Sequence, residues 1–440
     1  MADLAASGDH APLAYAPSSW TVPSHAAMFA GALPRALGLG QAPGGTPAGV
    51  RDVVQRLGPR LLPTVLRRAG YTTVGASCNS WISPATGFDT GFDRFDRVTL
   101  PRAEVYDQGG VAGSLRWLWH GARAQLDDGA EAVAGRVRDW FDGWDGRQPF
   151  FWFVNLVECH SPYLPPRPWN DLPLVQRLRA ARDVPRYQSL EAVWRHNTTG
   201  EPVAPVALER MRHLYGRSIA ALDAWIGRIL ELLDARGVLD DTIVIVTSDH
   251  GENFGEGGLI GHAFSLDERL IRVPLVTRGL RLPEGPFTLD QLPSTVAAAI
   301  GLERHPWAAI SRPAAVAQFD PLVTPGAERL DEVARRWQLD ERGRRMFSEP
   351  LTCATDGRHK IVRWGEQDLH YDLSSDPLEL DGQPAAADPS RFRAVRDALH
   401  RPELWESEMV TVASVAGSHT PDGDHDVEAL EAQMRLLGYL

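Results

Sequence analysis

The sequence predicts an α/β protein with a mostly parallel central sheet, helices on both faces of that sheet, and a small C-terminal antiparallel sheet subdomain. Short apolar runs rich in Val, Ile and Phe alternate with stretches of helical periodicity, which is typical of parallel strands buried under helices. The length of 440 residues allows one large domain with an appended one. Near the C-terminus, short alternating runs are typical of an antiparallel sheet.

One long helix is predicted before the third of the main apolar runs. Its apolar residues recur every three or four positions from Met211 to Leu233, and Gly237 is expected to end it. The runs predicted as strands are residues 73–77 (TVGAS), 150–157 (FFWFVNLV), 243–247 (IVIVT) and 273–276 (VPLV).

Three segments lack clear periodicity. Residues 35–60 and 164–205 are rich in Gly, Pro and Arg, and we expect loops or excursions over the sheet edge there, the second as a covering segment. Residues 100–130 are equally irregular. We expect this third segment and residues 164–205 to line the mouth of a pocket.

The C-terminal part is predicted as a separate unit. The pattern weakens over residues 303–347, becomes a short antiparallel sheet over residues 350–373, and is helical from Pro389 onward. We therefore expect a catalytic α/β domain over residues 1–310, followed by a linker and an α+β subdomain over residues 311–440.

Composition excludes several classes of protein. The net charge of -12, without a basic run, argues against a nucleic-acid binder. Cys78, Cys159 and Cys353 are odd in number and far apart, which favours a reducing compartment over a disulfide framework. The first residues lack the pattern of a signal peptide, and no apolar run reaches the ~18 residues that span a bilayer. We expect a cytoplasmic protein that does not bind membranes.

The segment T-S-D-H-G-E directly follows a predicted strand. Ligands gather at the carboxyl ends of parallel strands, which places Asp249 and His250 where a site is expected. An adjacent carboxylate and imidazole suit a divalent cation once the backbone bends at Gly251. An Asx turn with a solvated histidine would explain the same residues.

The segment S-S-W-T-V-P-S-H opens a predicted helix. Thr21 would then lie at a helix N-terminus, with Pro23, Ser24 and His25 in the first turn. Backbone amides and the helix dipole favour an anion there, which suits a nucleophile that attacks a tetrahedral oxyanion ester. On spacing alone, an ordinary N-cap explains these residues more simply.

Two further histidines follow turn-forming sequences. His160 follows the apolar run at residues 150–157 and could donate to a leaving-group oxygen. His262 ends the glycine-rich segment G-G-L-I-G-H, which would let it approach a bound ion closely. Each histidine could equally be a hydrogen-bonded turn residue or part of a surface loop.

Together these segments resemble the sulfatase family of the alkaline phosphatase superfamily, in the branch that has W-T-x-P-S-H in place of C-x-P-S-R. They occur in family order and extend over roughly three quarters of the chain. The matching stretches are SSWTVPSHAAMFAGALP, GYTTVGASCNSWISPATGFDTGFDRFD, FVNLVECHSPYLPP, YGRSIAALDAWIGRILELLDARGVLDDTIVIVTSDHGENFGEGGLIGHAFSLDERLIRVPLV and DGRHKIVRWGEQDLHYDLSSDPLEL.

The resemblance implies a role for the nucleophile segment. Thr21 occupies the position of the cysteine that sulfatases convert to formylglycine, so no formylglycine is expected and Thr21 would attack directly. His25 replaces the arginine of the family pattern, which weakens a sulfate-specific interpretation. Asp249 and His250 match the metal-binding pair, which implies a divalent ion: Ca, Mg, Mn or Zn.

The resemblance also implies contacts to a small anionic ester. His160 and His262 match positions that contact the transferred group or the leaving oxygen. Asn79 lies near a polar substrate contact of the family, and Ser24 is expected to be a second one. The substrate itself is not identified by the sequence.

The chain departs from the family pattern at its start. Family members begin with a strand ending in two aspartates that supply the other half of the metal site, whereas Asp3 and Asp9 lie in a different context here. With Asp249 and His250 alone, we expect weak cation binding and a central sheet with unpaired edges. A start downstream of the true one and loss of the metal in this lineage remain alternatives.

Two classes of function therefore remain open. The first is an enzyme that hydrolyses or transfers the acid group of a sulfate, phosphate or phosphonate ester. The second is a pseudoenzyme that binds an anionic ligand or a partner. A metal-free enzyme with a different reaction, in a biosynthetic pathway, is a third and weaker alternative.

Overall fold

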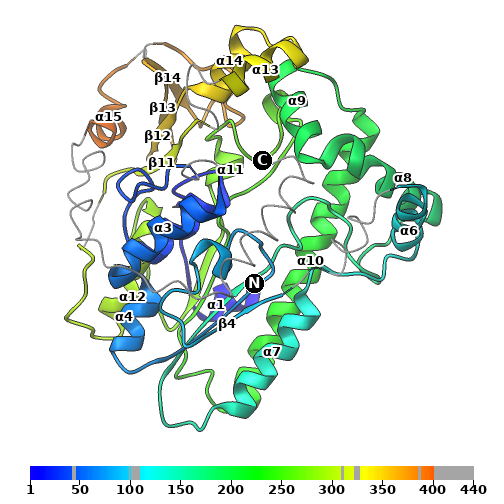
Figure 1. Cartoon of the computed structure of the whole chain (residues 1–440). Helices are drawn as coiled ribbons and strands as arrows, with labels where there is room; N and C mark the ends of the chain where they lie inside the picture. Colours follow the sequence, from blue (N-terminus) through cyan, green and yellow to red (C-terminus); the bar gives the residue numbers. More distant parts are fainter. Residues whose placement is uncertain are drawn as a thin grey trace.

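The computed structural model describes residues 1–41, 46–98, 100, 110–308, 312–321, 328–384 and 388–400 (Figure 1). Its strands are β1 (Asp9–His10), β2 (Ala14–Tyr15), β3 (Thr72–Ser77), β4 (Arg94–Arg97), β5 (Phe150–Asn155), β6 (Val244–Thr247), β7 (Asn253–Phe254), β8 (Ile260–Gly261), β9 (Leu275–Arg278), β10 (Phe287–Thr288), β11 (Ala315–Phe319), β12 (Leu351–Thr355), β13 (His359–Trp364) and β14 (Gln367–Asp372).

The helices lie around these strands. They are α1 (Ala2–Ser7), α2 (Thr21–Ala30), α3 (Pro47–Leu57), α4 (Leu62–Arg68), α6 (Gly110–Arg123), α7 (Ala130–Gly143), α8 (Leu174–Asp183), α9 (Leu190–Thr199), α10 (Pro205–Ala235), α11 (Glu268–Ile271), α12 (Leu292–Ala299), α13 (Glu328–Trp337), α14 (Glu341–Ser348) and α15 (Arg393–Leu399).

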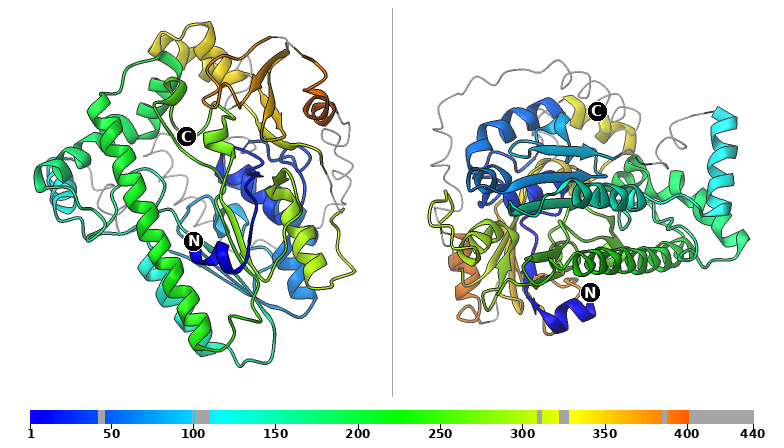
Figure 2. Two further views of the ribbon diagram at one scale, coloured as in Figure 1. Left: turned by 180° about the vertical axis from the view of Figure 1, so that it is seen from behind. Right: turned by 90° about the horizontal axis from the view of Figure 1, so that it is seen from below.

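A parallel sheet of order β4-β3-β5 is covered by helices on both faces. Side chains of β5 alternate between these faces. Phe151 and Phe153 pack against the core that contains α2 and α3, whereas Trp152 and Val154 pack against α7 and α10. The views in Figure 2 show α7 and α10 running side by side, and the indole of Trp225 on α10 donates to the carbonyl of Ala130 at 2.7 Å. The predicted α/β class is confirmed.

The strands predicted at residues 243–247 and 273–276 form a separate sheet of order β1-β9-β6. β9 runs antiparallel to both neighbours in this sheet. β5 and β6 are thus edge strands that do not pair with each other, and neither has a described strand on its second edge. Every residue of both strands is half-buried. The predicted strands that became β5 and β6 therefore lie in two different sheets of the described chain.

The C-terminal sheet is antiparallel, as predicted, with the order β11-β12-β13-β14. Its first strand, β11, lies within the segment where the sequence pattern weakens. The sheet shares a hydrophobic cluster with the N-terminal part of the chain, because Phe319 and Phe347 pack with Tyr15 and Phe264. Helix α15 ends at Leu399, and the predicted helical region beyond residue 400 lies outside the described residues.

Three segments predicted as loops contain helices instead. Helix α3 lies in residues 35–60, α8 and α9 lie in residues 164–205, and α6 lies in residues 100–130, of which residues 101–109 are outside the described chain. The physical reason is clear in α3, where Thr46 caps the amide of Gly49 and valines on one face are buried. Glycine and proline at the helix ends hid this periodicity in the sequence.

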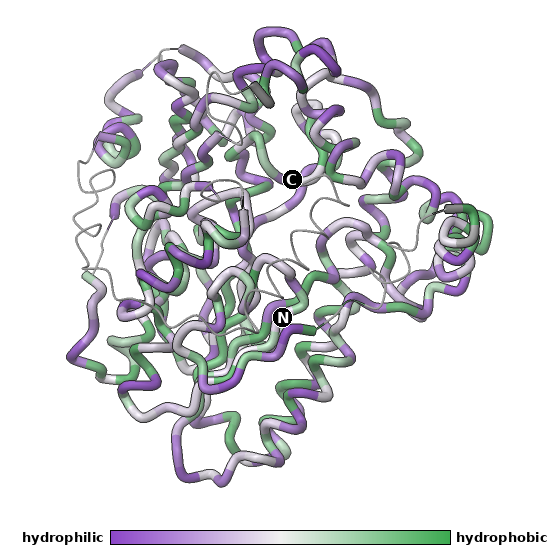
Figure 3. Tube along the Cα trace, viewed as in Figure 1, coloured by the Kyte–Doolittle hydropathy of each residue, from purple (hydrophilic) through white to green (hydrophobic). Residues whose placement is uncertain are grey.

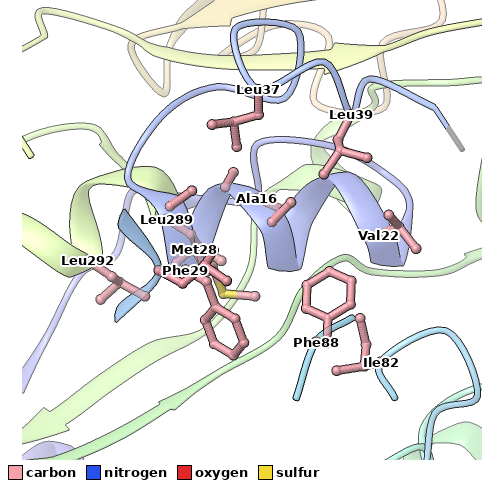
Figure 4. Close-up of a cluster of buried hydrophobic side chains, with 14 of the residues drawn as sticks. Ala16, Val22, Met28, Phe29, Leu37, Leu39, Ile82, Phe88, Leu289 and Leu292 are labelled. Atoms are coloured by element: carbon pink, nitrogen blue, oxygen red, sulfur yellow. The ribbon is translucent and has the colours of Figure 1, made fainter. Parts of the chain in front are cut away.

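Helix α2 lies within the largest cluster of buried side chains. Phe29, Ile82 and Phe88 lie on one side of the helix in Figure 4, and Leu37 and Leu39 lie on the other. All residues of α2 are buried, which fixes the position of its first turn. Figure 3 shows the contrast with α13 and α14 at the surface, where hydrophilic residues dominate.

The three cysteines are free thiols, and burial raises the pKa of Cys159 to about 12. Among the described residues, no helix combines the length and apolar character required to cross a bilayer.

Candidate active site

The first turn of α2 positions Thr21. Trp20 is extended and precedes the helix, so Thr21 is its first residue. An α-helix leaves the amides of its first turn without internal partners, and the dipole there favours negative charge. Only 4% of the surface of Thr21 is exposed to solvent, so the residue lies in a largely enclosed environment.

The segment after β6 meets this helix end. The Oγ1 of Thr21 lies 3.3 Å from the Nε2 of His250, although the residues are 229 positions apart. The hydroxyl of Ser24 donates to the backbone oxygen of Asp249 at 2.7 Å and so joins the helix to the loop. Gly251 has no room for a side chain, since a Cβ there would lie 2.0 Å from the carbonyl oxygen of Arg269.

His25 lies behind Thr21 and is almost fully buried. Its Nδ1 lies 2.9 Å from the backbone oxygen of Thr21, and its Nε2 lies 3.2 Å from the amide nitrogen of Asn155. The carbonyl accepts and the amide donates, so His25 carries its proton on Nδ1. Burial lowers the pKa of His25 although Asp249 opposes this shift. This neutral histidine fixes the backbone of the proposed nucleophile.

Asp249 presents one oxygen of its carboxylate to the histidines. Its Oδ2 lies 3.5 Å from the Nδ1 of His25 and 3.6 Å from the Nε2 of His250, beyond the usual length of a hydrogen bond. Burial raises the pKa of Asp249, but its interactions with His250 and His25 outweigh this effect and hold the pKa below the ordinary value. The carboxylate is therefore ionised.

Three histidines direct the same ring nitrogen inward. The Nδ1 of His160, His250 and His262 lies 2.7, 3.0 and 3.2 Å from the carbonyl oxygens of Ser161, Gly251 and Ser19. Their Nε2 atoms consequently face the site, and those of His160 and His262 lie 3.1 Å apart. The rings of His250 and His262 stack with centroids 4.2 Å apart, and burial lowers the pKa of His262 well below the ordinary value.

The structure thus brings Thr21, His25, Asp249 and His250 together, with His160 and His262 beside them. Ser24 lies in the cluster as a link to the backbone of Asp249. Asn79 lies in the turn after β3, where its side-chain oxygen accepts from the amide of Trp81 at 2.9 Å. No hydrogen bond joins Asn79 to these histidines in the described part of the chain, so its substrate contact stays a prediction.

Neither early aspartate approaches the cluster. Asp3 lies in α1, and the Oδ2 of Asp9 accepts from the amide of Leu282 at 3.0 Å. That bond is the main cause of the lowered pKa of Asp9.

Sequence reasoning missed two polar residues of the site. Asn155 ends β5 and connects His25 to the hydroxyl of Ser77, which donates to its Oδ1 at 3.1 Å. Glu252 follows the aspartate-histidine-glycine segment, and its carboxylate lies beside His160 and His262. Asn155 is the last residue of an apolar strand and Glu252 follows another, and these positions were the available signal.

Two family models and several curated proteins match the chain. The family model "Sulfatase" matches residues 2–284, and the model "Type I phosphodiesterase / nucleotide pyrophosphatase" matches residues 207–370. A choline-sulfatase of Rhizobium meliloti is 27% identical over 290 residues, which cover 61% of this chain and 53% of the relative. The multifunctional alkaline phosphatase superfamily protein PehA of Trinickia caryophylli is 25% identical over 308 residues, covering 61% and 58%.

The fold has counterparts among solved structures. A phosphonate monoester hydrolase of Agrobacterium radiobacter aligns with a TM-score of 0.59 at 20% identity, over 90% of this chain and 88% of that one. The chain spans about half the length of the curated relatives it matches.

Proposed function

The chain belongs to the sulfatase family, and we propose that it hydrolyses or transfers the acid group of a small anionic ester, with Thr21 as the nucleophile. The ester is a sulfate, phosphate or phosphonate ester, which are the chemistries that the names of its relatives include. One observation carries the proposal: the Thr21 hydroxyl, at the start of a buried helix, lies 3.3 Å from His250 beside the carboxylate of Asp249.

Thr21 attacks the sulfur or phosphorus atom in this proposal. A bond forms between its Oγ1 and that atom, and the bond from the atom to the ester oxygen breaks. The Oγ1 loses its proton, and the displaced ester oxygen takes up one and leaves as an alcohol. Water then cleaves the threonyl ester in a hydrolase, or an acceptor hydroxyl cleaves it in a transferase. The amides of the first turn of α2 favour the negative charge of the transferred group.

Asp249 and His250 have the donor atoms that a divalent cation requires. The Oδ2 of Asp249 makes no hydrogen bond to a described residue, and the Nε2 of His250 carries a lone pair because its Nδ1 donates to Gly251. Ca, Mg, Mn or Zn bound there would lower the pKa of the Thr21 hydroxyl and offset charge on the transferred group.

The other histidines hold and complete the site. His25 fixes the carbonyl of Thr21, so the hydroxyl keeps one direction relative to His250. His160 and His262 lie beside this pair and contact the transferred group or the leaving oxygen in this proposal. Ser24 keeps the loop of Asp249 against the helix.

The proposal is tested with p-nitrophenyl sulfate, a p-nitrophenyl phosphonate monoester and bis-p-nitrophenyl phosphate, each assayed with every candidate metal. Thr21→Ala is expected to lower kcat/KM for the active substrate on the order of 10³-fold or more, because the nucleophile is absent. Thr21→Ser keeps a hydroxyl and retains measurable activity. Thr72→Ala is the control and should not change activity, because Thr72 begins β3 and its hydroxyl donates to the exposed side chain of Gln148. Equal activity of Thr21→Ala and the unmodified chain contradicts the proposal.

A further inference from the structure

We propose that His160, Glu252 and His262 form a second cation site, built for a zinc-type ion and distinct from the Asp249 and His250 position. The three side chains come from segments after β5, before β7 and after β8. One ligand atom from each lies within 4.8 Å of the other two. Binding at this site does not depend on whether Thr21 is a nucleophile, so the inference goes beyond the proposed function.

The tautomers of the two histidines provide the first argument. His160 and His262 each direct Nδ1 at a backbone carbonyl, at 2.7 and 3.2 Å. A carbonyl only accepts hydrogen bonds, so each Nδ1 carries the proton and each neutral ring has its lone pair on Nε2. These two Nε2 atoms face each other at 3.1 Å. Two facing lone pairs repel, so a positive species is needed between them.

The separation of the nitrogens fits a metal ion. Zinc binds imidazole nitrogen at ~2.0–2.1 Å, and two such ligands in tetrahedral geometry lie about 3.3 Å apart. The observed 3.1 Å is close to this value. Donation of Nδ1 to a carbonyl is also the arrangement that fixes metal-binding histidines, because it holds the ring and directs Nε2 at the ion.

Glu252 provides the second and independent argument. Both of its carboxylate oxygens are shielded from solvent and have no hydrogen-bond partner in the described chain. No lysine or arginine among the described residues forms an ion pair with it; Arg269 instead pairs with Asp267 and binds the side chain of Asn253. The hydroxyl of Tyr163 lies close to this carboxylate, but a hydroxyl carries no charge to balance it. A buried carboxylate without a cationic partner is costly, and a cation beside it removes that cost.

The ligand set selects the kind of ion. Two imidazoles and one carboxylate are typical of zinc sites that keep a fourth position open, whereas calcium and magnesium prefer oxygen ligands. His262 stacks on His250, whose Nε2 lies 3.3 Å from the Thr21 hydroxyl. The cluster therefore borders the proposed nucleophile.

A proton shared by His160 and His262 is the competing explanation for their close nitrogens. It would leave Glu252 without a ligand role, so metal binding distinguishes the two explanations. The measurement uses the full chain, stripped with a chelator and titrated with Zn²⁺, with bound zinc counted by elemental analysis. Co²⁺ is the second probe, because its visible absorption reports low-coordinate nitrogen and oxygen ligation.

We expect one equivalent of zinc that is lost, or bound at least about 10-fold more weakly, in Glu252→Gln and in His262→Ala. Asp249→Asn should keep this equivalent, and its cobalt spectrum should persist. Glu158→Gln is the matched control, because Glu158 is a buried glutamate near His160 in sequence that binds the amide of Ala130 and not the cluster. Thermal unfolding in the presence of zinc shows that each variant folds.

Zinc binding that is equal in Glu252→Gln and the unmodified chain overturns the inference. So does a chain whose only zinc is removed by Asp249→Asn. The outcome is separable from the proposed function, because Thr21→Ala should abolish turnover while leaving the zinc count unchanged.

Discussion

At the residue scale, the proposed nucleophile depends on a buried chain of hydrogen bonds. Ser77 donates to Asn155, Asn155 donates to His25, and His25 donates to the carbonyl of Thr21. None of these side chains needs to touch a substrate to matter. This series of hydrogen bonds sets where the Thr21 hydroxyl lies relative to His250. A change at Asn155, which contacts Thr21 only through His25, should therefore alter the reaction.

Asn155→Ala tests this series of hydrogen bonds. The substitution leaves the Nε2 of His25 without its amide partner and removes one bond of the Ser77 hydroxyl, which keeps its bonds to the backbone of Asn79. We expect a loss of about 1–3 kcal/mol in the free energy of unfolding. Urea denaturation measures the loss as a lower midpoint with an unchanged slope. We also expect a lower kcat with little change in KM, since position and not binding is affected. An unchanged midpoint would show that His25 does not rely on Asn155.

A second buried group joins the C-terminal sheet to the site-bearing half of the chain. The Nζ of Lys360 on β13 lies 2.6 Å from the Oε1 of Glu379, 3.3 Å from that of Glu268, and 2.6 Å from the carbonyl of Leu266. Lys360 is fully buried. Burial raises the pKa of Glu379 although Lys360 opposes the shift.

Lys360→Met should cost roughly 3–5 kcal/mol, because it leaves buried carboxylates without their cation. The deficit should be larger at pH 8 than at pH 5. A carboxyl with a raised pKa keeps its proton in the folded state when the unfolded chain has released it, so stability falls as pH rises above the unfolded value of 4.5. Urea denaturation at both pH values measures this. Addition of Glu379→Gln should recover part of the loss, and a deficit independent of pH would contradict the assignment.

At the element scale, the position of Thr21 in the first turn of α2 depends on how the other end of the helix is held at Gly31. Gly31 has φ 69° and forms the left-handed cap, donating to the carbonyl of Ala27. A Cβ on Gly31 would lie 2.3 Å from the Cδ1 of Trp307, whereas one on Gly38, with φ 72°, would meet nothing within 4 Å. The two glycines share a positive φ and differ in what surrounds them.

Gly38→Ala should therefore cost only the strain of the left-handed conformation, about 1–2 kcal/mol. Gly31→Ala should cost clearly more, because the indole must also move, and it should lower activity through α2. Thermal or urea unfolding of the two variants gives the comparison. Equal losses for both would mean that the Trp307 contact does not hold the helix end.

At the scale of the whole molecule, the sequence predicted the elements better than their pairing. The apolar runs became β3, β5, β6 and β9, and the periodic segment became α10, with Gly237 in the left-handed region after it. These signals are local, because each strand or helix needs only its own pattern. The separation into two sheets depends on contacts between distant segments, which no local pattern contains.

The same reason limits the prediction of the site. Thr21 begins a helix, and Asp249 and His250 follow a strand, so each could be proposed from its own segment. Glu252 lies in the motif that was quoted, yet its place beside His160 and His262 depends on the fold of β7 and β8. Asn155 likewise gains its meaning only when β5 meets α2. Burial and partners, not residue type, identify both.

The central claim is that Thr21 carries the transferred group during turnover. The most direct test is a rapid chemical quench of the full chain with its best substrate, followed by digestion and mass spectrometry of the peptide that contains Thr21. We predict that this peptide gains the mass of one sulfuryl or phosphoryl group on Thr21, and that the added mass disappears as turnover proceeds. Turnover with an unmodified peptide, or with the group on another side chain, would contradict the account.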